Sequence, residues 1–198
     1  MSEQRVWSGR FPLDQVRFRH RRFDGRMSEI RTWELWRRGP AAALLPYDPV
    51  TDQVVLIEQF RLPALAAGVD PMLVELPAGL CEPHEDPADT IRREMQEEMA
   101  LSADRMEKIG AFVLTPGGAD EICHLYAGRV TAPPADAEGI AGHAGEIAES
   151  EDIRARVWPA ERAIAAVFAG RFTNSVTALA LFWLAAKRAA LREAWRTA

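Results

Sequence analysis

The apolar residues that follow Pro87 recur at the spacing of a helix with one buried side. Pro87 suits the first helical position, where its missing N–H is not needed, and Asp86 before it can cap the helix. The residues of the apolar stripe are Ala88, Ile91, Met95 and Met99. Because they lie three or four residues apart, the pattern predicts a helix that packs this stripe on the core.

Three carboxylates lie beside that stripe. Glu94, Glu97 and Glu98 are three and four residues apart, so their side chains gather on one flank of the predicted helix. Like charges at this spacing repel one another, and a hard divalent cation such as Mg²⁺, Mn²⁺ or Ca²⁺ would relieve the repulsion. A solvated acidic flank is the alternative, and the charges alone do not decide between the two.

Elsewhere the apolar residues alternate or run together over short segments, which is typical of β-strands. The segments expected as strands are 41–47, 53–59, 72–76, 106–114, 122–130 and 153–158. Helices are expected at 160–169 and 174–195, and loops at 63–70 and 131–150. Strands mixed with helices predict an α/β sandwich.

The first 38 residues have a different character. Two β-leaning segments, 16–23 and 27–36, flank Asp24-Gly25, which is a strong hairpin signal. The arginines of the predicted hairpin and the residues directly after it are Arg17, Arg19, Arg21, Arg22, Arg26, Arg31, Arg37 and Arg38, and Trp33 and Trp36 lie among them. The hairpin is either a basic, aromatic surface for a phosphate-bearing ligand or a partner subunit, or a solvated edge kept soluble by its charges. An isolated hairpin is barely stable, so a surface to pack on is expected.

Composition narrows the class of protein. The chain of 198 residues is long enough for one domain with a full core. Its net charge of −5 argues against nucleic acid as a main partner, which would call for a basic face. Two cysteines are too few for a disulfide framework, which favours a cytoplasmic location. The longest apolar stretch, 176–186, is too short to span a bilayer, and no membrane association is expected.

The end of the expected loop 131–150 is acidic. Glu146, Glu149, Glu151 and Asp152 fall within seven residues. Long loops inside compact domains are usually functional or disordered. Taken alone, this one is best explained as a solvated acidic loop.

The stretch from residue 79 to 101 resembles the Nudix box. That motif is a glycine, five residues, Glu, seven residues, Arg-Glu, an apolar residue, any residue, Glu-Glu, any residue, Gly and an apolar residue. The residues on pattern are Gly79, Glu85, Arg93, Glu94, Met95, Glu97, Glu98 and Leu101. Ala100 stands where the family has glycine, a position that ends the helix with positive φ and that alanine adopts at a cost of about 1 kcal/mol.

Segments outside the box resemble the ADP-ribose pyrophosphatase branch of the Nudix hydrolases. They are 18–21, 45–49, 54–59, Glu75 with 77–79, 116–118 with Glu121, and 151–154. This resemblance implies the Nudix fold, a mixed β-sheet sandwich flanked by helices with an N-terminal β-hairpin extension. It divides the chain into an extension of residues 1–38 and a Nudix domain of residues 39–198. It also implies a homodimer whose N-terminal strands cross to the twin subunit.

The resemblance assigns roles to particular residues. The Ala78 carbonyl, Glu94 and Glu98 would hold Mg²⁺, or Mn²⁺ in its place, with Glu97 near or within the coordination shell. Glu149 would activate water, with Glu146 and Glu151 as rivals, and Glu151 would be a further metal ligand. Arg93 and Glu85 would pair to fix the loop against the helix. Arg61 would contact a phosphate. The residues expected to line the adenine and ribose pocket are Arg10, Phe11, Trp33, Glu34, Leu80, Thr115 and Glu121.

The expected activity is hydrolysis of the pyrophosphate bond of ADP-ribose to AMP and ribose 5-phosphate. Within the class, another nucleoside diphosphate sugar such as GDP-mannose, NADH or a diadenosine polyphosphate is the alternative substrate. Outside the class, the alternative is a nucleotide-sensing module without turnover. That alternative is disfavoured because all the glutamates of the box are present. A purely structural protein would leave the carboxylate cluster unexplained.

Overall fold

The computed structural model describes residues 1–144 and 152–196, which form two units. The first unit combines residues 1–40 with 112–123. The second unit contains the other described residues, from Ala41 onward. The predicted boundary after residue 38 stays a prediction.

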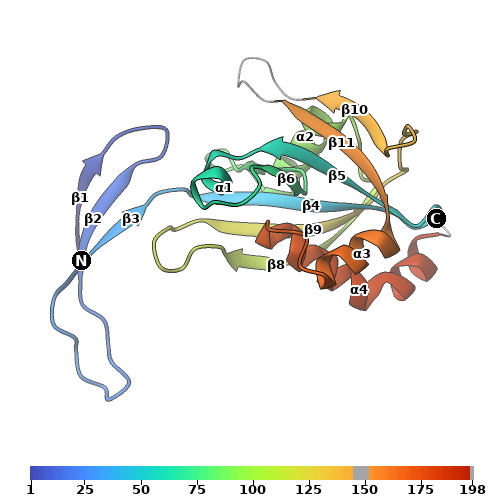
Figure 1. Cartoon of the computed structure of the whole chain (residues 1–198). Helices are drawn as coiled ribbons and strands as arrows, with labels where there is room; N and C mark the ends of the chain where they lie inside the picture. The colour runs from blue at the N-terminus through green and yellow to red at the C-terminus, as the bar shows by residue number, and fades with distance from the viewer. Residues whose placement is uncertain (145–151, 197–198) are drawn as a thin grey trace. The chain divides into compact units, whose positions relative to one another are not determined.

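The second unit is built on a sheet with strand order β10-β11-β5-β4-β9-β8, while β6 pairs with β5 and β7 pairs with β4 (Figure 1). Its strands are β4 (Pro40–Asp48), β5 (Gln53–Phe60), β6 (Met72–Glu75), β7 (Ala78–Leu80), β8 (Arg105–Val113), β9 (Ile122–Arg129), β10 (Ile140–Ala144) and β11 (Ile153–Pro159). The helices are α1 (Leu62–Ala66), α2 (Pro87–Met99), α3 (Ala160–Phe168) and α4 (Ser175–Trp195). This architecture confirms the predicted α/β class, a β-sheet flanked by helices.

Both faces of the central strands are buried. Val55 and Ile57 of β5 belong to the apolar cluster that includes Ile91 and Met95 of α2. Leu56 lies between them, is fully buried and points to the opposite face, because side chains alternate along a strand. Helices α3 and α4 cover that face (Figure 1). Burial on both sides explains why β4 and β5 read as continuous apolar runs.

Helix α2 begins and ends as its sequence predicts. The Asp86 side chain accepts a hydrogen bond from the Ala88 N–H, and Pro87 occupies the first turn. Ile91 and Met95 of the predicted stripe are fully inaccessible to solvent, Met99 is 8% exposed, and Ala88 is half-buried. Ala100 ends the helix in the left-handed conformation with φ 52° and ψ 34°, at the position where the box has glycine.

The substitution Ala100→Gly is expected to stabilise the protein by about 0.5 to 1 kcal/mol. Relief of the left-handed strain on alanine outweighs the larger unfolded-state entropy of glycine. Urea unfolding measures the difference. Ala67→Gly is the control, because Ala67 ends α1 with an ordinary φ of −81° and gains nothing from glycine. No gain at residue 100 would contradict the strain argument.

A partly buried ionic cluster holds α4 to the turn between β4 and β5. Asp52, in that turn, accepts a 2.8 Å hydrogen bond from the Tyr47 hydroxyl and forms a two-point ion pair with Arg188 of α4. Arg192, one turn further along, lies 3.4 Å from the same carboxylate and also donates to the Pro49 carbonyl at 3.3 Å. The hydrogen bond from Arg188 is the main cause that lowers the pKa of Asp52.

Asp52→Asn is expected to lower the free energy of unfolding at pH 7 by about 2 kcal/mol, because a charge-assisted pair is lost. Asn tolerates the left-handed backbone at this position as well as Asp does, so the loss reports the charge. Since the folded-state pKa of Asp52 is depressed, the pair contributes fully above its unfolded pKa, near 3.9. That contribution disappears as the pH falls through the folded-state pKa, so the two proteins should converge in stability below about pH 4. Urea unfolding between pH 2.5 and 7 measures this, with the exposed Glu193→Gln as the control. A constant difference across that range would contradict the assignment.

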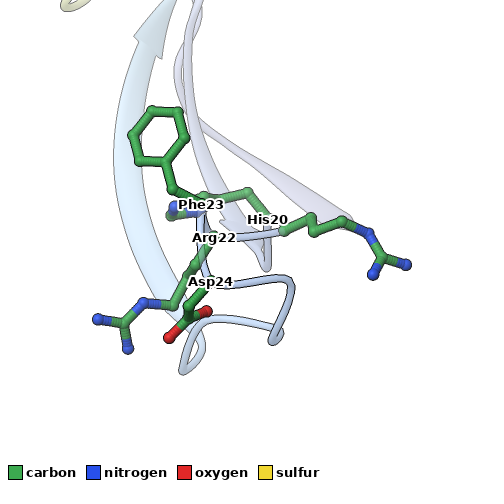
Figure 2. Close-up of a pocket in the computed structure, with 5 residues that line it drawn as sticks. His20, Arg22, Phe23 and Asp24 are labelled. Carbon is green, nitrogen blue, oxygen red and sulfur yellow. The ribbon is translucent and has the colours of Figure 1, made fainter.

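The first unit contains the sheet β1-β2-β3, made of β1 (Ser2–Trp7), β2 (Leu13–Phe18) and β3 (Arg31–Trp36) (Figure 1). The predicted hairpin is present, since β2 and β3 pair antiparallel from Leu13 with Trp36 to Phe18 with Arg31. Its strands are shorter than expected, and Arg21 and Met27 form only an isolated bridge between them. A shallow hollow lies at this connection, lined by His20, Arg21, Arg22, Phe23 and Asp24. Figure 2 shows the Phe23 ring directed away from the Asp24 carboxylate, and none of the lining residues is a predicted site residue.

Four elements differ from the sequence prediction. Residues 63–70, expected as loop, contain most of the five-residue helix α1. Strand β10 lies within the expected loop 131–150 and pairs with β11. Strands β7 and β1 were not expected, and they form because β4 and β2 supply their hydrogen-bond partners. These elements are too short to carry a periodic apolar pattern of their own.

Within the described ranges, no helix combines the length and apolar character needed to cross a membrane.

Candidate active site

The buried stripe of α2 determines which way the carboxylates of that helix face. Because Ile91 and Met95 are fixed in the core, Glu94 and Glu98, which flank Met95, are turned toward β7. Glu98 is 4% exposed, and its Oε2 accepts a 3.1 Å hydrogen bond from the backbone N–H of Ala78. The carboxylate is therefore held directly beside the main chain of β7.

Gly79 explains how closely Glu94 can approach that strand. A Cβ at residue 79 would lie 1.9 Å from the Glu94 Oε1 and 2.1 Å from its carboxyl carbon. The φ of Gly79 is not positive, so the glycine is required for space and not for an unusual backbone conformation. Only a residue without a side chain allows the Glu94 carboxylate to lie against β7.

Arg93 ties the box helix to the preceding loop. It lies 3.5 Å from Glu85 in that loop, as predicted, and 2.8 Å and 2.9 Å from Glu94 and Glu97. Burial opposes the charged guanidinium, yet the charges of Glu94, Glu85 and Glu97 raise the pKa of Arg93 above its usual value. The Glu82 N–H is the first of several donors that lower the pKa of Glu85. Arg93 thus offsets the repulsion between the neighbouring carboxylates.

Arg61 lies between β5 and α1, at the N-cap position of the helix, and its side chain makes no capping hydrogen bond. Its Nε donates a 2.7 Å hydrogen bond to Oε2 of Glu75, a carboxylate that is 5% exposed at the end of β6. Two residues of chain separate Glu75 from Ala78. The Arg61 side chain retains 39% of its exposure and can reach a ligand in solution.

A second cluster forms within the first unit. The guanidinium carbon of Arg38 lies 4.0 Å from the ring centre of Phe11 and 4.9 Å from that of Trp36. The two rings meet edge to face at 5.8 Å, and Arg38 also pairs with Glu121 at 3.2 Å. The guanidinium carbon of Arg10 is 5.7 Å from the Phe11 ring. Stacked aromatic and guanidinium groups of this kind suit a flat, electron-rich ligand such as a nucleobase.

A family model for the NUDIX domain matches residues 37–174, which is more than half of the chain. The chain belongs to the NUDIX family. The box motif, the fold and the family match therefore agree, and the predicted identification as a Nudix hydrolase is confirmed.

Relatives with known names are similar over most of the chain. The "ADP-ribose pyrophosphatase" of Escherichia coli (strain K12) is 40% identical over 195 residues, which are 98% of this chain and 91% of that protein. The "GDP-mannose pyrophosphatase" of Yersinia enterocolitica (serotype O:8 / biotype 1B) is 33% identical over 149 residues, 75% of this chain and 74% of that protein. A solved structure described as "Crystal structure of ADP compounds hydrolase" superposes with a TM-score of 0.70 at 19% identity. The match covers 100% of this chain and 95% of the chain in that structure, and at 19% identity it supports the fold alone.

Nudix enzymes of this branch generally use a divalent metal, and the box donors fit a hard cation. Glu94, Glu98 and the backbone carbonyl of Ala78 are oxygen donors of the kind that Mg²⁺ and Mn²⁺ prefer. Within residues 1–144 and 152–196, no three His, Cys, Asp or Glu side chains are grouped closely enough to hold a metal by themselves. Two carboxylates beside a backbone oxygen leave positions for water and substrate oxygens, as Mg²⁺ sites commonly do.

The other predicted site residues divide between the units. Leu80 is half-buried on β7, in the unit of the box. In the first unit, Trp33 and Glu34 are exposed on β3, and Thr115 lies exposed at the turn before Ala119. Trp33 meets Phe18 edge to face at 5.1 Å. The residues predicted for the base and the late metal ligand, Glu146, Glu149 and Glu151, lie outside the described residues.

Arg38 and Trp36 were not singled out as ligand-binding residues from the sequence. They were counted only among the many arginines and aromatics of the hairpin. Their contacts with Phe11 and Glu121 join segments that are 25 or more residues apart, so no local pattern could have selected them.

Proposed function

We propose that this Nudix enzyme hydrolyses the pyrophosphate bond of ADP-ribose to AMP and ribose 5-phosphate, with Mg²⁺ as the cation. The observation that carries the proposal is the 40% identity to the Escherichia coli ADP-ribose pyrophosphatase over 98% of the chain. All the box glutamates are present, and Glu94 and Glu98 lie beside β7, which supports turnover over mere binding.

The residues of the box unit bind and orient the pyrophosphate. Glu94, Glu98 and the Ala78 carbonyl would hold the cation, with Glu97, which is more exposed and pairs with Arg93, near or within its coordination shell. The bound cation neutralises phosphate charge and lowers the pKa of a bound water. Arg61 contacts a phosphate through the guanidinium nitrogens that Glu75 does not occupy.

Proton removal from the attacking water is assigned to the acidic segment. Glu149 is the base and Glu151 a further metal ligand, with Glu146 and Glu151 as the rival bases. A carboxylate that deprotonates water must come within hydrogen-bond distance of it. Exchange of each of these glutamates for glutamine, one at a time, identifies the base as the variant with the lowest kcat.

The nucleoside part of the substrate is assigned to the residues that the family resemblance gives for the adenine and ribose pocket. The proposed adenine and ribose contacts are Arg10, Phe11, Trp33, Glu34, Leu80, Thr115 and Glu121, and we propose Arg38 as a further contact. Among these, the stack of Arg38 on Phe11 is the most suitable surface for a purine.

GDP-mannose is the second candidate substrate, because a GDP-mannose pyrophosphatase is also among the relatives. Initial rates with Mg²⁺ on ADP-ribose, GDP-mannose, NADH and a diadenosine polyphosphate separate the candidates. We expect kcat/KM to be highest for ADP-ribose. A higher value for another compound would overturn the substrate assignment, and tight nucleotide binding without turnover would identify a sensor.

A homodimer with exchanged N-terminal strands is also proposed, in the cytoplasm and without nucleic acid as a partner. The first unit buries few apolar side chains among its described residues, while Trp7, Trp33 and Trp36 are 65%, 52% and 42% exposed. A small sheet of this kind needs a further surface to be stable. Light scattering should give twice the chain mass of 22.0 kDa. A stable, fully active monomer would refute the dimer.

A further inference from the structure

The first turn of α4 is joined to the active site by an unbroken series of hydrogen bonds. Asn174 caps the helix, since its Oδ1 accepts from the Thr177 N–H at 2.9 Å and from the Thr177 hydroxyl at 3.1 Å. The amide nitrogen of Asn174 is directed elsewhere and donates a 2.6 Å hydrogen bond to Oε1 of Glu75. The same side chain therefore caps the helix and holds a carboxylate of the neighbouring strand.

Glu75 connects Asn174 to Arg61 by hydrogen bonds. One of its oxygens receives Asn174 and the other receives the Nε of Arg61 at 2.7 Å. A carboxylate that is 5% exposed requires such partners, because burying an unpaired charge is costly. With Nε engaged, the plane of the Arg61 guanidinium is fixed, and its two terminal nitrogens keep a defined direction.

Thr177 restrains the backbone that leads into the Nudix box. Its hydroxyl oxygen accepts a 3.1 Å hydrogen bond from the Leu76 N–H, and Thr177 is fully buried. Two residues later, the Ala78 N–H is held by Glu98 from the other side. The segment between Glu75 and Ala78 is thus pinned by α4 at its start and by α2 at its end.

We propose that Asn174 and Thr177 are positioning residues of this enzyme. Asn174 orients Arg61 through Glu75 toward a phosphate of the substrate, and Thr177 sets the backbone on which the Ala78 carbonyl is presented to the cation. This inference rests on the proposed function for its kinetic test, while its structural part is measurable without substrate.

The decisive variant for Asn174 is Asn174→Asp. Aspartate caps a helix as well as asparagine does, but it replaces the amide donor with a carboxylate that repels Glu75. We expect kcat/KM for ADP-ribose to fall about ten-fold, mainly through KM, which is the scale of one lost charge-assisted contact to the substrate. Ser175→Asp is the matched control, because it adds the same charge one residue later at an exposed position and should leave kcat/KM within about two-fold.

A double-mutant cycle separates positioning from general destabilisation. If Asn174 acts through Arg61, then Asn174→Asp has no further effect on kcat/KM in the Arg61→Ala background. Additive losses would overturn the proposal.

A pair of variants tests Thr177. Thr177→Val should lose activity, whereas Thr177→Ser should retain it, since only serine keeps the hydroxyl that accepts a hydrogen bond from the Leu76 N–H. Equal activity of the two variants would overturn the role of Thr177.

The structural part is read from the side-chain Nε–H signal of Arg61 by NMR, assigned by its absence in Arg61→Ala. We expect slow hydrogen exchange of this group in the wild-type protein and faster exchange in Asn174→Asp. Unchanged exchange would refute the positioning of Arg61, whether or not ADP-ribose is the substrate. If the wild-type protein leaves ADP-ribose intact but the exchange behaves as expected, only the proposed function fails.

Discussion

Hydrolysis of ADP-ribose by Glu98→Gln is expected to be at least about a hundred-fold slower than by the wild-type protein. Glutamine keeps the shape of the side chain, and its amide oxygen can still accept the hydrogen bond from the Ala78 N–H. What it removes is a buried negative charge beside β7, and with it one of the two carboxylates proposed to hold the cation. Loss of one group that stabilises developing charge in a water-excluded site costs about 10²–10³ in kcat.

Two further measurements test whether the loss of activity in Glu98→Gln comes from weaker cation binding. Binding of Mn²⁺, followed by calorimetry, should weaken in Glu98→Gln while the urea midpoint stays near that of the wild-type protein. Glu193→Gln carries the same chemical change on an exposed face of α4 and should keep full activity. Normal cation affinity in Glu98→Gln would exclude Glu98 from the metal site.

Gly79→Ala is expected to reduce ADP-ribose hydrolysis about as strongly as Glu98→Gln does, but through a steric clash. The new Cβ would overlap the Glu94 carboxylate, which must then leave its place against β7. Overpacking of this kind typically costs about 1–3 kcal/mol of stability. We therefore expect a lower urea midpoint together with loss of cation binding and of ADP-ribose hydrolysis.

The control for Gly79 is Gly142→Ala, on β10. A Cβ there would meet no atom within 4 Å, and the φ of this glycine is not positive. Its activity and stability should stay close to the wild-type values. The double variant Gly79→Ala with Glu94→Ala removes the overlapping side chain and should recover stability without recovering activity. A double variant no more stable than Gly79→Ala would show that Glu94 is not the obstacle.

Local features of the sequence were sufficient for the box helix. Asp86 and Pro87 define its start, and Ile91 and Met95 define its buried side. Even the left-handed end at Ala100 was predictable, because the motif has glycine there. All these signals lie within about 15 residues of one another. They act through hydrogen bonds and side-chain spacing that a single helix determines for itself.

Short elements were not predictable in this way. Strand β7 has three residues and β10 has five, and each is a strand only because another strand lies beside it. Helix α1 was predicted as a loop because it has only five residues. The sequence of such a segment contains too few positions to show a period.

The site residues also divide into those that the local sequence determined and those that only the tertiary structure brought together. The sequence by itself determined the family, the box glutamates and the pairing of Arg93 with Glu85, because the motif places all of them within one loop and one helix. Only the tertiary structure decided that Gly79 is needed for space, that Arg38 stacks on Phe11, and that Asn174 reaches Glu75 across 99 residues of chain. Contacts of that range depend on how sheets and helices pack, and packing is a property of the whole fold, which no local pattern records.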